Sequence, residues 1–340
     1  MDRIMNPFDL LELRAPIAQS LDKSDLASCV LVSKTWYTLF VPFLWESILL
    51  REYRNRPDDR SARAIWSSPK RDFVKEVTYN CIFESTHRQL CEMPSFSNLK
   101  ILNIGSACNV RFLDQAAMLI TRNPTITRLY IRNGSSDSET NAWDLASGLV
   151  HLEDLTMQYC QFTCDDVDAL IITCGRLRSL FFEGVNFYSA LLIVPDLPVF
   201  PIRTLEVDSC IWFEDSFLLF VSKCPDLERF YCIGVNESFW HSFSTLAASG
   251  TWPNLVSLVI INACISDEDL ATILTSMPRI HTLDAGNTAF GEKSFAALRP
   301  CLKTIAMLDL RDCGNVTPAM TTEVRQSCPN MRKQDFMCSV

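Results

Sequence analysis

The stretch LVSLVIINACISDEDLATILTSMPRIHTLDA, residues 255–285, contains one complete structural unit and the start of the next. It opens with LVSLVI, whose apolar first, fourth and sixth positions predict a half-buried β-strand. A capping serine and an amphipathic segment follow, and Pro278 closes that segment two residues before the apolar spacing begins again at Ile280. One unit therefore consists of a strand, a turn, a helix and a proline, and it runs from Leu255 to Arg279.

The same apolar frame recurs along most of the chain. Successive copies begin at nearly constant intervals, and such a period is typical of repeat proteins. The ten copies begin at Val74, Leu99, Ile126, Leu152, Leu177, Ile202, Leu227, Leu255, Ile280 and Ile305, and a degraded eleventh copy is expected at Met331. The period predicts an α/β solenoid, with a curved parallel sheet on the inside and helices on the outside.

Helix signals occupy the second half of several units. Ser266 suits the N-cap position with Asp269 three residues on, and the stretch from Thr163 repeats this arrangement. Pro318 follows Thr317 directly and suits the first helical position. These signals predict helices that begin shortly after the turn in each of these units.

Two segments lack a full helix signal. Prolines at 195, 198 and 201 forbid a regular helix of full length between Leu177 and Ile202, so an irregular turn is expected there. The polar residues 132–148 predict a mobile loop before a short helix.

The fifteen cysteines are expected to be reduced core residues. No pair has the C-x-x-C spacing of a zinc site, so we expect no metal and no cofactor. The repeat instead places them at two fixed positions, Cys160, Cys210 and Cys313 at one and Cys174, Cys224 and Cys328 at the other. The four histidines lie in different units, and none shows a cysteine or carboxylate partner at catalytic or ligand spacing.

Charge and hydropathy exclude several classes of protein. The net charge of −9 at pH 7 argues against nucleic acid as the main partner. No window approaches the roughly 18 apolar residues of a membrane helix, and no secretory signal opens the sequence. We therefore expect no membrane partner and a place in the cytoplasm, the nucleus or both.

Residues 74–335 resemble the leucine-rich repeat, and its cysteine-containing variety fits best. The resemblance implies a solenoid of about ten to eleven repeats over residues 74–340 that binds other proteins. A polar linker or cap is expected over residues 51–73, and a small helical domain over residues 1–50.

The N-terminal 50 residues contain more apolar surface than so short a segment can bury. We expect one amphipathic helix over residues 6–21, interrupted by Pro16, and a second that starts at Ser24 or Asp25 and ends at Pro42. FLWESILL is expected to add a last helical turn or two. A bundle of about 45 residues is too small to cover a helix that is apolar nearly all round, so another polypeptide or the first repeat must do so.

Residues 5–50 resemble the F-box, with LDKSDLASCVLVSKTWYTLF and FLWESI as its most specific stretches. The resemblance implies binding to the S-phase-kinase-associated adaptor and, through it, to the cullin and RING subunits of an SCF-type ubiquitin ligase. Carried over position by position, the adaptor-binding residues are Pro7, Leu10, Ile17, Leu21, Leu26, Val30, Val32, Trp36, Leu44 and Trp45.

The inner face of the solenoid is the candidate surface for a protein substrate. Side chains between the buried positions of each strand point to this face, and exposed apolar clusters tend to be binding sites. The substrate-binding candidates are Tyr130, Arg132, Phe181, Glu183, Glu206, Asp208, Tyr231, Val259 and Ile261. We expect basic residues of the substrate to meet the three acids, although these acids could equally serve only to keep the array soluble.

The sequence thus predicts a non-enzymatic substrate receptor, with two alternatives. The first is a ligase-independent repeat scaffold or inhibitor, in which residues 1–50 fold back on the array. The second is an enzyme, which would need groups such as Asp284 and Asp309 to converge with a nucleophile or a metal, and the sequence shows neither. The few arginines expected on the inner face, Arg132 and Arg311, argue against a phosphate pocket.

Overall fold

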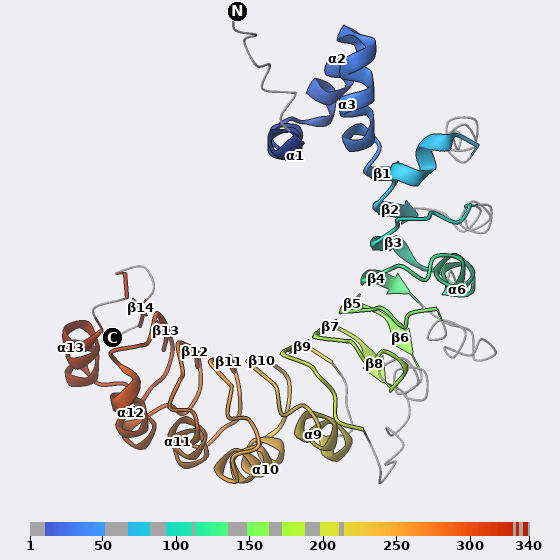
Figure 1. Cartoon of the computed structure of the whole chain (residues 1–340). Helices are drawn as coiled ribbons and strands as arrows, with labels where there is room; N and C mark the ends of the chain where they lie inside the picture. Colours follow the sequence, from blue (N-terminus) through green and yellow to red (C-terminus); the bar gives the residue numbers. More distant parts are fainter. Residues whose placement is uncertain are drawn as a thin grey trace, which may run out of the picture.

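The computed structural model describes residues 11–51, 67–81, 93–110, 113–134, 148–162, 172–187, 198–210, 214–328, 331–332 and 336–338. Within these residues the chain forms a curved arc, with a parallel sheet along its inner side and the helices α9 to α13 along its outer side (Figure 1). The helices α1 to α3 lie at one end of the arc and β14 lies at the other. The prediction of an α/β solenoid with the sheet inside is therefore confirmed.

The sheet runs in chain order, with every neighbouring pair of strands parallel. Its strands are β1 (Ser47–Arg51), β2 (Glu76–Cys81), β3 (Ile101–Val110), β4 (Arg128–Gly134), β5 (Asp154–Gln158), β7 (Ser179–Glu183), β9 (Thr204–Asp208), β10 (Arg229–Cys232), β11 (Ser257–Val259), β12 (Thr282–Asp284), β13 (Met307–Asp309) and β14 (Phe336–Met337). A second, small sheet pairs β6 (Gln161–Phe162) with β8 (Asn186–Phe187).

The described helices are shorter than the repeat and lie between the strands. They are α1 (Leu11–Ser20), α2 (Lys23–Val32), α3 (Lys34–Leu44), the 3-10 helix η2 (Pro69–Phe73), α6 (Leu113–Arg122), α9 (Glu214–Ser222), α10 (Glu237–Ala248), α11 (Asp267–Ser276), α12 (Glu292–Leu298), the 3-10 helix η4 (Arg299–Cys301) and α13 (Pro318–Ser327). None of them is long and apolar enough to cross a membrane.

The apolar frame of the sequence forms the core. Along β5, β7 and β9 buried and half-buried residues alternate, as the spacing predicts. The frame residues of each unit stack on those of the next, so that a single cluster extends from Ile48 to Cys328. Burying each such side chain contributes about 1.5–3 kcal/mol relative to its exposure, and the stack of repeats adds these contributions along the arc.

The predicted caps of α11 and α13 are confirmed. Ser266 precedes α11, and its hydroxyl accepts a hydrogen bond from the backbone N–H of Asp269 at 3.0 Å. Thr317 caps α13 in the same way, and Pro318 occupies the first helical position. The helix predicted from Thr163 lies outside the described residues, as do most of the irregular turn before Ile202 and of the polar loop 132–148.

Aromatic side chains fill the core between α10 and the sheet. Phe243 stacks on Phe230 and on Trp252, with ring centroids 5.1 Å and 4.2 Å apart. Trp240 is fully buried among them, and its indole N–H has no hydrogen-bond partner among the described residues. This aromatic cluster holds α10 firmly against β10.

The prediction of one long second helix in the N-terminal region is wrong, because the helix is interrupted at Ser33, between α2 and α3. Ser33 is extended, with φ −161° and ψ 166°, and its hydroxyl accepts a hydrogen bond from the backbone N–H of Trp36. A serine that caps a new helix in this way competes with continuation of the old one. Two prolines expected to disturb helices do not end them, since Pro16 lies inside α1 and Pro42 inside α3.

The prediction of a last helical turn in FLWESILL is also wrong, because residues 47–51 form β1. The spacing of Trp45, Ile48 and Leu50 is that of the repeat frame, and Ile48 is buried in the core of the solenoid. The sheet therefore begins before residue 50, where the boundary of the helical domain was expected, and its first strand pairs directly with β2.

The sheet extends past the tenth frame, as the degraded copy at Met331 predicts. Met331 is half-buried against the core, and Phe336 of β14 pairs with Leu308 of β13. This strand ends the described part of the solenoid.

Candidate functional site

The inner face carries side chains in rows, because parallel strands in register place equivalent residues side by side. Tyr130, Thr156, Phe181, Glu206, Tyr231 and Val259 form one such row, which we name the middle row. Arg132, Gln158, Glu183 and Asp208 form a second row beside it. The predicted substrate-binding residues Tyr130, Arg132, Phe181, Glu183, Glu206, Asp208, Tyr231 and Val259 belong to these rows, and Ile261 lies just beyond β11.

Three acids on β7 and β9 form a patch of uncompensated charge. Glu183 and Asp208 are direct neighbours in the sheet, and Glu206 precedes Asp208 by two residues on the same strand face. None of the three makes an ion pair with a lysine or arginine of the described residues. By contrast, Asp154 on the neighbouring β5 pairs with Arg128 at 2.8 Å. We name Glu183, Glu206 and Asp208 the carboxylate patch.

Neutral donors orient the carboxylate patch. Glu183 accepts hydrogen bonds from the amide of Gln158 at 2.5 Å and from the hydroxyl of Tyr159. Asp208 accepts from Ser209 at 2.7 Å and from the hydroxyl of Tyr231 at 3.3 Å. These bonds fix the carboxylates without cancelling their charge.

The tyrosines of the site are held as neutral phenols. Burial, with the nearby charge of Asp208, raises the pKa of Tyr231 to about 12. The hydrogen bond to Glu183 raises the pKa of Tyr159 above its ordinary value. Both hydroxyls therefore remain donors to the acids at neutral pH.

Tyr159 is held in a left-handed backbone conformation, with φ 52°. Equivalent turn residues in the other described units are Asn133, Gly184, Ser209, Gly234, Asn262, Asn287 and Asp312, all with positive φ. A bulky side chain is an outlier at such a position. Gly184 leaves room for the tyrosine ring, because a Cβ at position 184 would lie 2.7 Å from it. The guanidinium of Arg132 lies 5.8 Å from the centroid of the same ring.

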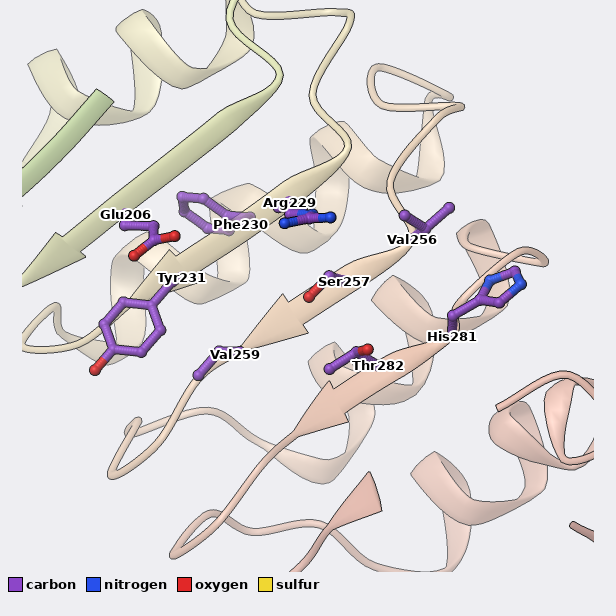
Figure 2. A pocket seen from close by; sticks show the side chains of 9 residues that line it. All are labelled: Glu206, Arg229, Phe230, Tyr231, Val256, Ser257, Val259, His281 and Thr282. Carbon is purple, nitrogen blue, oxygen red and sulfur yellow. The ribbon is translucent and has the colours of Figure 1, made fainter. Parts of the chain in front are cut away.

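A hollow of about 400 Å³ opens on the inner face over β9 to β12 (Figure 2). Three of the predicted substrate-binding residues line it, namely Glu206, Tyr231 and Val259 of the middle row. Arg229 and His281, which the sequence analysis did not single out, line it as well. The lining of the hollow thus combines apolar side chains and hydroxyls with one acid, Glu206, and one strong base, Arg229.

Sequence reasoning missed Tyr159 and Arg229 for different reasons. The signal for Tyr159 was present, since an aromatic residue stands where most other units place glycine, asparagine, serine or aspartate. Arg229 is the first residue of β10, and the exposure of such first residues on the inner face depends on the exact start of each strand.

The two acids considered for an enzyme, Asp284 and Asp309, are buried in the structure. Asp309 is held by the guanidinium of Arg311 at 2.6 Å, and Asp284 accepts a hydrogen bond from the backbone N–H of Gly286 at 3.1 Å. Burial, and then the charge of Asp309, raises the pKa of Asp284. Both acids thus bind groups two residues further along their own repeats, and neither lines the hollow.

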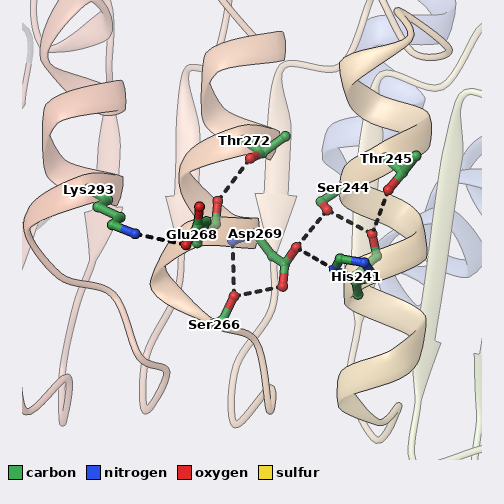
Figure 3. Close-up of polar contacts among 8 residues, drawn as sticks. All are labelled: His241, Ser244, Thr245, Ser266, Glu268, Asp269, Thr272 and Lys293. Carbon is green, nitrogen blue, oxygen red and sulfur yellow. Dashed lines mark hydrogen bonds and ion pairs between the residues drawn. The ribbon is translucent and has the colours of Figure 1, made fainter.

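One histidine does have a carboxylate partner, contrary to the sequence analysis. His241 on α10 lies 3.1 Å from Asp269 on α11, and Asp269 also accepts hydrogen bonds from Ser244 at 2.8 Å and Ser266 at 2.6 Å (Figure 3). The hydroxyl of Ser244 bonds to the carboxylate and not to the imidazole, so these residues lack the geometry of a serine nucleophile and its base. The cluster is a structural tie between two outer helices.

The six cysteines placed in the core are buried, as predicted, at Cys160, Cys174, Cys210, Cys224, Cys313 and Cys328. Burial raises the pKa of the Cys174 thiol to about 12, so it stays protonated and packs as a small hydrophobe. Within the described part of the chain, no three histidine, cysteine, aspartate or glutamate side chains gather in a way that could hold a metal ion.

The helices α1 to α3 form a small core of their own around Ala18, Leu26 and Phe40. Most of the predicted adaptor-binding residues pack into that core, so they are half-buried rather than free: Ile17, Leu21, Val30, Trp36 and Leu44. Trp45 is half-buried too, with the ammonium of Lys70 on η2 5.1 Å from its ring centroid. Pro7 and Leu10 lie outside the described residues.

Three apolar side chains near the break between α2 and α3 remain exposed. Leu31 is 84% exposed, Val32 63% and Tyr37 41%. Of these, only Val32 belongs to the predicted adaptor-binding set. We name Leu31, Val32 and Tyr37 the hinge patch.

No protein-family model matches the chain, and no curated protein matches it in sequence. Among solved structures, it is similar to an internalin from Listeria monocytogenes, with a TM-score of 0.53 and 13% identity over 98% of this chain and 90% of that chain. It also aligns with the Rad7 and Elc1 complex in yeast, at a TM-score of 0.42 and 12% identity over 96% of this chain and 84% of that chain. The first likeness agrees with the repeat pattern, and the chain folds as a leucine-rich-repeat solenoid.

Proposed function

We propose that this chain is the non-catalytic substrate-recognition subunit of an SCF-type ubiquitin ligase in the cytoplasm or the nucleus. In this proposal α1 to α3 bind the S-phase-kinase-associated adaptor, and the adaptor connects the chain to the cullin and RING subunits. The inner face of the solenoid binds a protein substrate. This chain then supplies proximity, while ubiquitin transfer belongs to the other subunits.

The hinge patch is the observation that carries the adaptor half of the proposal. Most apolar side chains of the helical cluster pack against one another, whereas Leu31 and Val32 are its most exposed ones, ahead of Leu13 at 42%. Exposed apolar side chains gathered in one place mark sites of protein contact. Burying each of them against a partner would contribute about 1.5–3 kcal/mol.

The carboxylate patch supports the substrate half. It lies in the middle of the inner face beside Tyr159, Tyr231 and Phe181, on strands far along the chain from the hinge patch. Aromatic side chains next to fixed charges are typical of binding hot spots. Uncompensated acids favour a substrate surface with basic residues and speed its association.

The adaptor half is tested by titrating the purified adaptor into the purified full-length chain by calorimetry. Wild type should bind, and Val32→Asp should weaken binding at least tenfold, because a charge would be buried at the contact. Val199→Asp is the matched control, since Val199 is 67% exposed and lies outside the helical cluster. Equal binding by wild type and Val32→Asp would rule out this contact.

A ligase-independent scaffold is the second candidate, and the position of Trp45 favours it. Trp45 stands at the first position of the repeat frame that leads into β1, and η2 covers its ring through Lys70. On this reading α1 to α3 are simply the N-terminal cap of the solenoid. A wild-type chain that shows no heat of binding with the adaptor, while still binding peptides on its inner face, would favour the scaffold.

A further inference from the structure

A row of polar side chains on the inner face has no partner within the described part of the protein. The row consists of the first residues of five successive strands in register, and we name it the donor row: Ser179, Thr204, Arg229, Ser257 and Thr282. Among the residues that the structure describes, none of these side chains makes a hydrogen bond or an ion pair. On the two preceding strands the same row is satisfied, because Arg128 pairs with Asp154 at 2.8 Å.

Arg229 and Glu206 line the same hollow but do not pair with each other. Just before the same two strands, Arg203 and Glu228 do form an ion pair, at 3.3 Å. The hollow therefore presents one open positive and one open negative charge, and Tyr231 lies beside the negative one (Figure 2). A ligand of one sign would satisfy only half of this surface.

The spacing of the two charges suits an extended polypeptide. Tyr231 stands two residues after Arg229, roughly 6.6 Å along β10, and Glu206 lies beside Tyr231 on the next strand, about 4.8 Å across the sheet. In an extended segment the side chains of residues i and i+2 point to the same face at about the same separation. One segment laid along β10 can thus place one side chain over Arg229, while a side chain two residues away reaches across to Glu206 on β9.

We infer that the hollow takes an extended segment of a protein partner that carries an acidic and a basic side chain two residues apart. The acidic side chain lies over Arg229, where the hydroxyls of Thr204 and Ser257 on the flanking strands supply further donors. The basic side chain lies over Glu206 and meets Asp208. This inference names the substrate class of the inner face, and so it rests on the substrate half of the proposed function.

The probe for this inference is a displayed library of random peptides, selected on the full-length chain. Wild type should enrich peptides in which Asp or Glu stands two positions from Lys or Arg, in the one order that the direction of the bound segment sets. Fluorescence anisotropy with the best peptide should show a loss of at least tenfold for Arg229→Glu. Lys303→Glu makes the same charge change on an exposed residue outside the hollow and should bind as wild type does.

A charge swap distinguishes a lost contact from a damaged fold. The double variant Arg229→Glu with Glu206→Lys should bind poorly to the wild-type peptide and well to a peptide with its two charges exchanged. Enrichment without the charge pair, no enrichment at all, or unchanged affinity of Arg229→Glu would each overturn the inference.

The adaptor titration separates this result from that of the ligase proposal. Arg229→Glu should bind the adaptor as wild type does, because Arg229 lies on β10 and the hinge patch lies between α2 and α3. Peptide selection with the charge pair but no adaptor binding would leave the inference standing and remove the ligase. Adaptor binding without selection of the charge pair would support the ligase proposal and overturn the inference.

Discussion

Asp267 caps the helix of the following repeat, since its carboxylate accepts a hydrogen bond from the backbone N–H of Gly291 at 2.9 Å. The same carboxylate accepts from the backbone N–H groups of Lys293 and Ser294, each at 3.0 Å. These are N–H groups that a helix leaves without partners at its N-terminus, and the glycine at the N-cap of α12 offers no side chain for them. One residue of α11 therefore completes α12.

Asp267→Ala should lower the free energy of unfolding by about 1–2 kcal/mol, because three backbone donors lose their acceptor. Urea unfolding followed by circular dichroism measures the change. Asp226→Ala is the control, since Asp226 is exposed and makes no side-chain hydrogen bond among the described residues. A midpoint for Asp267→Ala that matches the control would show that the cap adds nothing.

The contribution of Asp267 should also depend on pH. Burial acts to raise its pKa, but the hydrogen bonds from Ser294, Lys293 and Gly291 together outweigh burial and hold the pKa below that of an ordinary aspartate. Because the pKa is lower in the folded state, the carboxylate stabilises the fold fully at a pH above its pKa in the unfolded chain. This stabilisation is lost as the pH falls through its pKa in the folded protein. The difference in unfolding free energy between wild type and Asp267→Asn should therefore be larger at pH 6 than near pH 3.

Gly291→Ala should destabilise the chain through contact with the same carboxylate. A Cβ at Gly291 would lie 2.9 Å from Asp267 Oδ2, whereas its φ of −147° is open to any residue. We expect a loss of about 1–2 kcal/mol in urea unfolding. The double variant Asp267→Ala with Gly291→Ala should lose less unfolding free energy than the two single variants lose together. The reason is that the clash of the new Cβ disappears with the carboxylate. Strict additivity would contradict this explanation.

Asn123→Ala should be among the more costly substitutions in the first half of the solenoid. Asn123 is fully buried, accepts from the backbone N–H of Phe96 at 2.6 Å and donates to the backbone carbonyl of Leu119 at 2.7 Å. Removing it leaves two buried backbone groups unpaired, at about 1–3 kcal/mol each. Thermal unfolding checks this, with Asn98→Ala as the control, since that variant loses only exposed hydrogen bonds, chiefly the one to the carbonyl of Asp72. Equal melting temperatures for the two variants would contradict the assignment.

Tyr159→Asn should raise stability while it lowers binding on the inner face. Asparagine tolerates the left-handed conformation that tyrosine adopts at a cost on the order of 1 kcal/mol. The substitution also removes the ring beside Arg132 and the hydroxyl bonded to Glu183. Tyr159→Phe keeps the ring and is the control for its contribution. Calorimetric unfolding and anisotropy with a selected peptide give the two readouts, and a less stable Asn variant would show that the contacts of the ring and hydroxyl outweigh the backbone strain.

Reversal of the carboxylate patch should abolish recognition of basic residues. The variant Glu206→Lys with Asp208→Lys should lose affinity for the selected peptide at least tenfold, and the affinity of wild type should fall as salt is added. Unchanged affinity for the double variant would return these acids to the role of solubilising charges.

The repeat frame was predictable because each unit repeats the same burial pattern, and agreement among ten copies outweighs local ambiguity. The strand β1 escaped prediction because its frame begins at Trp45, ahead of the first recognised copy at Val74, in a segment whose resemblance favoured helix. The break at Ser33 did have a signal, a serine three residues before Trp36, but continuous apolar character hid it.

For the candidate site, the alternation of side chains along each strand predicted which residues face the inner side, but not which contacts they make. Alternation placed Glu206 and Tyr231 on the inner face, and they lie there. It could not show that Asp284 and Asp309 would be enclosed by neighbouring units, or that Arg229 would share a hollow with Glu206 without pairing. Such contacts depend on side chains from successive units, which lie one full repeat apart along the chain.

Only Trp45 and Glu46 separate the end of α3 at Leu44 from the start of β1 at Ser47. The carbonyl of Glu46 accepts hydrogen bonds from both Lys75 and Glu76, so this short connection is itself stitched to the next strand. A connection of two residues, one of them hydrogen-bonded to the next strand, leaves little room for α1 to α3 to turn relative to the sheet. Under the proposed function, this connection would set the distance and direction between an adaptor bound at the helices and a substrate bound on the inner face.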